Sequence, residues 1–212
     1  MSVSIQKAAL RKHLLEKRDA TSAEIREISS DKISQNLKQI DLFNDSQNIA
    51  SYFPIGSEVN TNHIMLDILE QGKSLLLPKV IGDSLEFYIV TSLEKLEKGR
   101  FDIMEPKDGC KKAEKIDCVL VPTIGVSKSG IRLGYGNGYY DKFLSTTNAV
   151  KISLTYSKQI VKSIPSNPQL QSLPIPRCGN STSRCEKKQN QGCQQVVRNL
   201  AHISMAIRSE ER

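Results

Sequence analysis

Tryptophan is absent from this 212-residue chain, and aromatic residues make up only 5% of it. No run of about 18 or more apolar residues occurs, so a membrane-spanning helix is not expected. Residues Met1–Asp19 mix basic and apolar side chains and lack the apolar core of a secretory signal. We therefore expect a cytoplasmic protein. The low acid content of this segment leaves mitochondrial import as the alternative.

None of the five cysteines forms a C-x-x-C pair, and no histidine pair lies near them. Zinc-site spacing is therefore missing, and the odd number favours reduced thiols. The net charge is +7, of which residues 166–212 contribute +4 through seven basic and three acidic side chains. The remaining +3, with few aromatics, suits a site for anionic small molecules better than a nucleic-acid platform. A nucleic-acid-associated protein stays open as a third hypothesis, resting mainly on the charge of the tail.

Hydrophobic periodicity and turn residues predict helices that alternate with strands. A first helix is expected over Ile5–Arg18. A second helix is expected to follow a capping box at Thr21–Glu24, and its buried stripe would be Ile25, Ile28, Ile33, Leu37 and Ile40. A third helix is expected from Asn60 or Thr61 to Gly72. Strands are expected over Asn48–Phe53, Ser74–Pro78, Leu85–Val90 and Asp117–Pro122, and from Ala149 onward. The pattern predicts an α/β fold: a three-layer sandwich with a largely parallel central sheet flanked by helices.

The composition changes after Pro165. Residues 166–195 are rich in Pro, Ser, Asn and Gln without an apolar period, which indicates loop or disorder. Val196–Ile207 carries a weak helical pattern. We expect one α/β domain over residues 1–165 and a divergent tail over 166–212.

Three glycines, Gly134, Gly136 and Gly138, follow a strand and precede a helix expected to start near Tyr139. Glycines at such a place allow positive φ and a close backbone approach to a phosphate, and a helix N-terminus presents free N–H groups to an anion. Arg132 adds a bidentate phosphate donor, and Asp141 adds an oxygen ligand of the kind Mg²⁺ prefers. The alternative is a tight turn with two core tyrosines and a solvated aspartate.

The spacing of these glycines matches neither the dinucleotide-binding G-x-G-x-x-G nor a P-loop, which would need G-K-[ST]. The residues therefore indicate phosphate binding but not a reaction.

The stretch "RLGYGNGYYD" (Arg132–Asp141) resembles the R-L-G-x-G-x-G-Y-Y-D signature of the 5-formyltetrahydrofolate cyclo-ligase family. Further segments match in the family's order and extend the resemblance over roughly Ile5–Pro165: "KAALR", "YFPIGSEVNT", "LLLPKV", "GRFDIMEP" and "IDCVLVP". The resemblance implies a compact, monomeric α/β enzyme. It also implies ATP- and Mg²⁺-dependent conversion of 5-formyltetrahydrofolate to 5,10-methenyltetrahydrofolate, through a phosphorylated formyl intermediate and with release of ADP and phosphate.

The resemblance also implies roles for individual residues. The ATP contacts would be Lys7, Arg11, Arg132, Leu133, Gly134, Tyr135, Gly136, Asn137, Gly138, Tyr139 and Tyr140. The folate contacts would be Phe53, Glu58, Tyr135, Gly136, Asn137, Gly138 and Tyr139, with Asp141 as a magnesium ligand and Arg132 and Tyr139 as the catalytic residues. Taken alone, Lys7 and Arg11 would form a solvated basic face, Phe53 would belong to the core, and Glu58 would be a surface acid.

The chain departs from the family pattern after Ser157–Pro165. We find no counterpart for a second magnesium-binding acid, and we expect the last strand of the sheet to be missing. Two hypotheses follow: an active cyclo-ligase, whose preference for polyglutamated folate is open, or a catalytically impaired form that still binds nucleotide and folate.

Overall fold

The computed structural model describes residues 2–99, 102–166 and 202–206. The helices are α1 (Val3–Asp19), α2 (Ala23–Leu37), α3 (Asp41–Asn44), α4 (Asn62–Glu70) and α5 (Tyr139–Thr146), with short 3-10 helices η1 (Leu93–Lys95) and η3 (Ser157–Gln159). The strands are β1 (Asn48–Ala50), β2 (Ser74–Ile81), β3 (Ser84–Val90), β4 (Leu96–Lys98), β5 (Met104–Pro106), β6 (Cys118–Pro122), β7 (Gly125–Ser127), β8 (Arg132–Leu133), β9 (Val150–Thr155), β10 (Ile160–Val161) and β11 (His202–Ala206).

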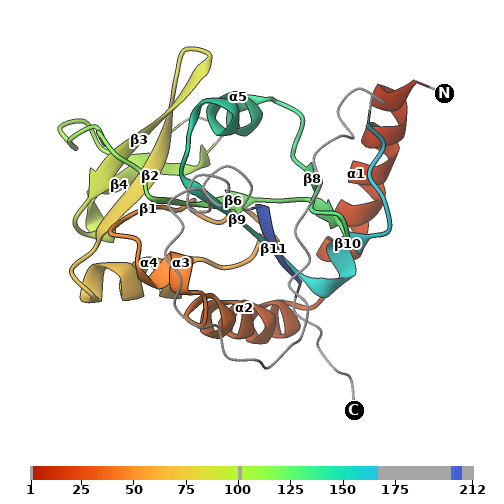
Figure 1. Ribbon diagram of the computed structural model, residues 1–212, viewed down its shortest axis with the longest axis horizontal. Helices are drawn as coiled ribbons and strands as arrows, with labels where there is room; N and C mark the ends of the chain where they lie inside the picture. Colours follow the sequence, from red (N-terminus) through yellow and green to blue (C-terminus); the bar gives the residue numbers. More distant parts are fainter. Residues whose placement is uncertain (1, 100–101, 167–201, 207–212) are drawn as a thin grey trace, which may run out of the picture.

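The main sheet has the strand order β11-β9-β6-β1-β2-β3. All neighbours in it pair in parallel except β3, which forms an antiparallel hairpin with β2. In Figure 1, α2, α3 and α4 lie on one side of this sheet and α5 lies on the other. The predicted three-layer α/β sandwich with a largely parallel sheet is therefore confirmed.

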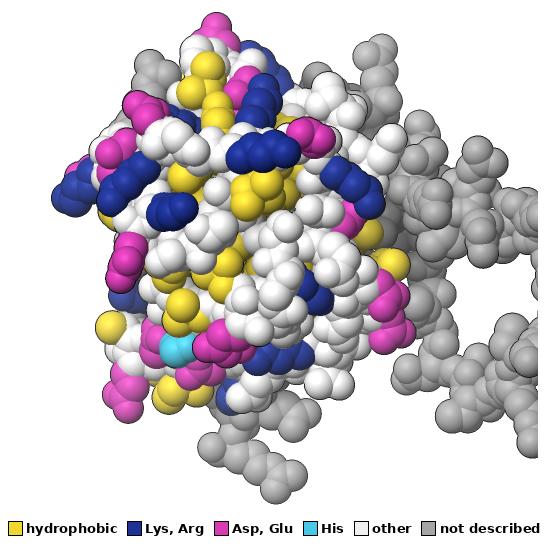
Figure 2. All heavy atoms as spheres, turned by 90° about the vertical axis from the view of Figure 1, so that its left-hand side faces the viewer, with side chains coloured by type: hydrophobic (Ala, Val, Ile, Leu, Met, Phe, Trp, Pro, Cys, Tyr) yellow, Lys and Arg dark blue, Asp and Glu magenta, His cyan; other side chains and the backbone are white. Residues whose placement is uncertain are grey.

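Charged side chains of both signs cover the side of the molecule where β3 and β4 lie. Figure 2 shows Lys/Arg and Asp/Glu interleaved there rather than gathered into a patch of one sign. Ion pairs in this region join Lys79 to Asp108 at 2.8 Å and Lys112 to Glu86 at 2.7 Å. Opposite charges so close together largely cancel at a distance.

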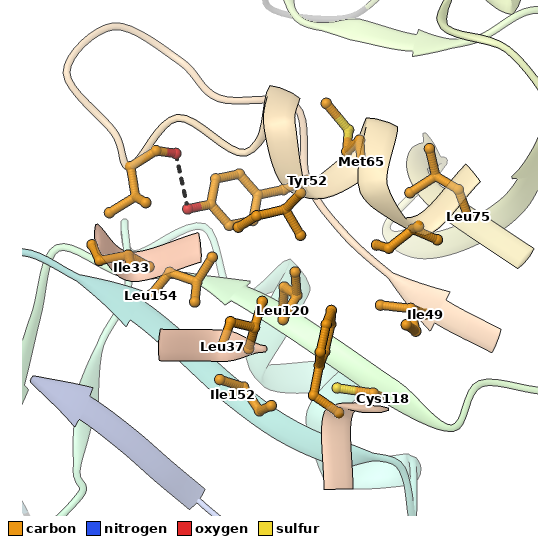
Figure 3. Close-up of a cluster of buried hydrophobic side chains, with 14 of the residues drawn as sticks. Ile33, Leu37, Ile49, Tyr52, Met65, Leu75, Cys118, Leu120, Ile152 and Leu154 are labelled. Carbon is orange, nitrogen blue, oxygen red and sulfur yellow. Dashed lines mark hydrogen bonds between the residues drawn. The ribbon is translucent and has the colours of Figure 1, made fainter. Parts of the chain in front are cut away.

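Alternation along β6 divides the core between the two faces of the sheet. Cys118 and Leu120 point to the face covered by α2 and α4, where they pack with Leu37 and Ile152 (Figure 3). Val119 and Val121 point to the opposite face, in the cluster that includes Leu144 of α5, Phe87 and Phe143. All four β6 side chains are buried because helices cover both faces.

Helix α1 stands apart from these layers, beside a small sheet of β10, β7 and β8. Its Leu14 packs with Ile124, Leu133 and Ile164 in a separate buried cluster. The helix approaches the small sheet very closely at Gly125, where a Cβ would lie 2.4 Å from Leu14 Cδ1. This contact places α1 against β7, which pairs with β8, the strand that leads into the glycine-rich loop.

Two local predictions for α2 are wrong. The N-cap is Ser22, whose hydroxyl accepts from the Ile25 N–H at 3.3 Å, whereas the Thr21 hydroxyl donates to the Lys17 carbonyl at 3.2 Å. Ile25 and Ile28 are also half exposed, so the buried stripe of α2 starts only at Ile33. The predicted helix stop at Gly72 is confirmed by its φ of +69°.

The C-terminal part contains a strand where we expected none. β11 (His202–Ala206) pairs in parallel with β9 at the edge of the main sheet, so these five residues are a strand and not helical as the pattern over Val196–Ile207 indicated, and the main sheet has a strand beyond β9. The loop or disorder predicted for residues 166–195 lies, apart from Ser166, outside the described residues.

Within the part of the chain that the structure describes, no helix is long and apolar enough to cross a membrane.

Candidate active site

The site lies at the point where the order of the main sheet reverses. From β1 the chain passes through α4 to β2 on one side, and later returns to place β6 on the other side. In open α/β sheets ligands bind outside the carboxyl ends of the strands at such a switch point. Tyr52 and Phe53 follow β1, and Pro122 ends β6; all three line one cavity there.

This cavity has a volume of about 340 Å³. It is lined by the segment after β1, the β2–β3 hairpin, β5, the glycine-rich loop and the start of α5: Tyr52, Phe53, Ile55, Glu58, Pro78, Val80, Leu85, Ile103, Glu105, Pro122, Arg132, Gly134, Tyr135, Gly136, Asn137, Gly138, Tyr139, Tyr140 and Asp141. Its volume falls within the range of small-molecule sites.

The glycine-rich loop needs its glycines for two reasons. Gly136 has a φ of +106° and Gly138 a φ of +78°, which are conformations that other residues rarely adopt. At Gly134 the reason is space: a Cβ there would lie 2.7 Å from an Arg132 guanidinium nitrogen and would displace that guanidinium. Arg11 of α1 holds the loop from the side by donating its Nε–H to the Gly134 carbonyl at 2.7 Å.

Arg132 and Asp141 form an ion pair at the edge of the cavity. Arg132 also donates to the carbonyl of Pro122 at 3.0 Å, so its guanidinium is fixed beneath the loop and is only 8% exposed. The Asp141 side chain is 69% exposed and binds Arg132 through Oδ1. Its other carboxylate oxygen has no hydrogen bond to the described residues.

Glu58 is a buried carboxylate in the cavity lining and is only 6% exposed. Its Oε2 accepts from the Ile55 N–H at 2.9 Å, and its Oε1 accepts from the hydroxyl of Tyr135. Burial raises the pKa of Glu58, while the Tyr135 and Ile55 hydrogen bonds and the charge of Arg18 lower it in part. The site therefore contains a buried carboxylate that can accept hydrogen bonds, and Glu58 is not the surface acid that its local sequence alone would indicate.

Arg18 is a site residue that sequence reasoning missed. It lies on α1 and is 5% exposed, and its Nη1 donates to the Tyr135 hydroxyl at 3.0 Å. Its Nε donates to Ser57 Oγ at 2.8 Å. The spacing of seven from Arg11 puts both arginines on one face of α1, and this periodicity was the signal that could have identified it.

The Tyr140 hydroxyl is buried and has no hydrogen-bond partner among the described residues, although the side chain lines the cavity. Burial is the main cause that raises its pKa, followed by the charge of Glu58, so the hydroxyl stays protonated and can donate. A buried hydroxyl without a partner is costly, which favours a role toward a ligand.

The structure brings most of the predicted site residues together. Eleven of them line the cavity: Phe53, Glu58, Arg132, Gly134, Tyr135, Gly136, Asn137, Gly138, Tyr139, Tyr140 and Asp141. Arg11 reaches the loop from α1. Leu133 is buried with Leu14 and contributes no side chain to the cavity, and Lys7 is half buried one turn before Arg11 without lining it.

The chain matches the family model described as the 5-formyltetrahydrofolate cyclo-ligase family over residues 3–174. It is 29% identical over 181 residues to the 5-formyltetrahydrofolate cyclo-ligase of Mus musculus. The aligned region covers 78% of this chain and 89% of the mouse protein. The enzyme of the same name from Mycoplasma pneumoniae is 32% identical over 73% of this chain and 88% of its own length.

Solved structures agree with these matches. The NMR structure of Aquifex aeolicus 5,10-methenyltetrahydrofolate synthetase superposes with a TM-score of 0.70 at 37% identity, covering 76% of this chain and 83% of that one. The 5,10-methenyltetrahydrofolate synthetase from Mycoplasma pneumoniae gives a TM-score of 0.61 at 31% identity, covering 76% and 92%. The signature loop, the switch-point cavity and these relatives lead to one conclusion: the chain belongs to the 5-formyltetrahydrofolate cyclo-ligase family.

Proposed function

We propose that this protein converts 5-formyltetrahydrofolate to 5,10-methenyltetrahydrofolate with ATP as co-substrate, releasing ADP and phosphate. The observation that carries the proposal is the composition of one cavity, which joins the signature loop to Phe53 and Glu58. Two substrates must meet in such a reaction, and the lining offers two chemically different sets of groups: the glycine-rich loop with Arg132, and Phe53 with the Glu58 carboxylate. A cytoplasmic location and a monomeric state remain predictions.

The nucleotide would bind at the glycine-rich loop. Loop N–H groups and the N-terminus of α5 supply donors for phosphate oxygens, and Arg11 and Arg132 supply positive charge from two sides. The positive φ of Gly136 and Gly138 lets the backbone approach a phosphate closely.

The folate would bind beside Phe53 and Glu58, which line the same cavity as Tyr140. The half-buried Phe53 offers an apolar wall for the flat pterin ring. Glu58 is an acceptor suited to the N–H edge of that ring, and the unpartnered Tyr140 hydroxyl offers a donor. The apolar surroundings strengthen each of these polar contacts because they exclude water.

Asp141 fits a magnesium ion. Mg²⁺ in nucleotide sites is commonly held by one or two carboxylates together with substrate phosphates, and Asp141 is an exposed carboxylate at the edge of the cavity next to the loop. When bound, the ion would neutralise charge on the phosphates.

The chemistry requires an unreactive formyl oxygen to become a leaving group. We infer that this oxygen attacks the γ-phosphorus of ATP while the bond from that phosphorus to the ADP oxygen breaks. N10 then attacks the formyl carbon and loses its proton, and the carbon–oxygen bond breaks to release phosphate. Little covalent work falls to the protein, so Arg132 and Tyr139 would act by placing the phosphoryl group and offsetting its charge.

The test is to measure phosphate release and methenyl product together with 5-formyltetrahydrofolate, ATP and Mg²⁺. We expect equal amounts of both, and neither without folate. Tight binding of both substrates without either product would contradict the proposal and favour the catalytically impaired form.

A further inference from the structure

We propose that Arg18 is a positioning residue for the folate substrate, which holds the Glu58 carboxylate in place through the hydroxyl of Tyr135. The inference rests on the proposed function, because it takes Glu58 as the acceptor for the pterin ring. It assigns a role to a helix residue that does not line the cavity itself.

The three groups form a chain of hydrogen bonds with one possible direction. A guanidinium only donates and an ionised carboxylate only accepts, whereas a phenol hydroxyl can do one of each. Arg18 Nη1 donates to the Tyr135 oxygen at 3.0 Å, so the single Tyr135 hydrogen points to Glu58 Oε1. Arg18 thus decides how Tyr135 is oriented, and Tyr135 in turn fixes one oxygen of Glu58.

The charge of Arg18 supports a functional reading. Among the described residues, none of the ion pairs includes Arg18, although the residue is only 5% exposed. Two carboxylates reach it only through a hydroxyl: Glu58 through Tyr135, and Asp19 through Ser57. Burying a cation without a direct partner is costly, so packing alone gives no reason to keep it.

The orientation of the Tyr135 side chain depends on contacts from outside the glycine-rich loop. Its side chain is 43% exposed and stands between Gly134 and Gly136. Arg18 supplies two contacts, the hydrogen bond and a guanidinium carbon 5.9 Å from the ring centroid. These contacts join α1 to the loop and to Glu58 across three separate parts of the chain.

The experiment is calorimetric titration of the full chain with 5-formyltetrahydrofolate and, separately, with ATP. We compare Arg18→Met, Tyr135→Phe and the double variant. Arg18→Met should weaken folate binding about tenfold to hundredfold, as expected for a lost hydrogen bond to a charged group, and should change ATP binding by less than about threefold. Tyr135→Phe should weaken folate binding to a similar extent. The double variant should be no weaker than the weaker single one, since both break one chain of contacts.

Two matched controls separate positioning from stability. Ser57→Ala removes only the arm of Arg18 that leads to Asp19, and Lys17→Met removes an exposed positive charge from the same helix turn. Both should bind folate within about twofold of the wild type, even if Ser57→Ala melts earlier. Equal losses of folate and ATP binding in Arg18→Met would indicate a merely structural role.

Failure of the inference is distinguishable from failure of the proposed function, because binding is measured without turnover. Folate binding that depends on Arg18 in a chain without turnover would contradict the proposed reaction alone. Turnover with unchanged folate affinity in Tyr135→Phe, or additive losses in the double variant, would overturn the role of Arg18. If Arg18→Met does not fold, Arg18→Lys decides: it keeps the positive charge but lacks the two guanidinium arms that bind Ser57 and Tyr135, so it should weaken folate binding and change ATP binding by less than about threefold.

Discussion

The substitution Glu58→Gln isolates the charge of the buried carboxylate at nearly constant shape. Glu58 accepts two hydrogen bonds, one from the Ile55 N–H at 2.9 Å and one from Tyr135. An amide has one acceptor oxygen, so its NH₂ group must face one of these two donors. If the NH₂ group faces Tyr135, the Tyr135 hydroxyl no longer has an oxygen of residue 58 to donate to. This hydroxyl also accepts from Arg18, so its hydrogen cannot turn toward Arg18 instead.

The magnitude follows from those contacts. Losing a charge-assisted hydrogen bond costs about 1.5–3 kcal/mol, which corresponds to roughly tenfold to hundredfold weaker folate binding. ATP binding should hardly change, because Glu58 is not among the proposed ATP contacts. Titration with 5-formyltetrahydrofolate checks the prediction, with ATP titration as the internal control. Folate affinity within about twofold of the wild type would refute the assignment of Glu58 as the pterin acceptor.

Four further predictions follow from the same geometry. Asp141→Asn should raise the Mg²⁺ concentration needed for half-maximal turnover by about tenfold or more, measured by magnesium titration; an unchanged requirement would argue against a metal ligand. Arg11→Met should weaken ATP binding about tenfold, because it removes the contact to the Gly134 carbonyl; unchanged ATP affinity by calorimetry would contradict this. Gly136→Ala should destabilise the loop by about 1–2 kcal/mol, since its φ is +106°, and denaturant unfolding should show the loss. The pKa of Glu58 is raised above its ordinary 4.5, so folate affinity should fall as the pH drops through that raised value. The stability of the wild type relative to Glu58→Gln should instead fall as the pH rises through the same value, because the folded state favours the protonated carboxyl. Folate affinity that does not depend on pH would contradict the prediction.

The elements with strong local signals were predictable. The apolar run of β6 predicted a strand that is buried on both faces, and the glycines before α5 predicted a loop with positive φ. The N-cap of α2 was predicted one residue too early because Thr21 and Ser22 are both good capping residues, and only the fold shows which one caps. Ile25 and Ile28 fit the helical period, but none of the elements that the structure describes buries that part of α2.

The predictions that failed or were missed depended on distant parts of the chain. Arg18 lies 117 residues from Tyr135, so no local pattern could pair them. β11 forms next to β9 although its own sequence has a weak helical period, because strand pairing depends on the neighbouring edge as much as on propensity. The role of Glu58 came from resemblance alone, and burial in the cavity supplies the physical reason that its local sequence lacks.

The most direct test of the central claim is the near-ultraviolet absorbance of a methenyl folate product after mixing the protein with 5-formyltetrahydrofolate, Mg²⁺ and ATP. We predict that the band grows with time, requires ATP, and is lost in Asp141→Ala. A folded sample that binds both substrates and produces no such band would contradict it.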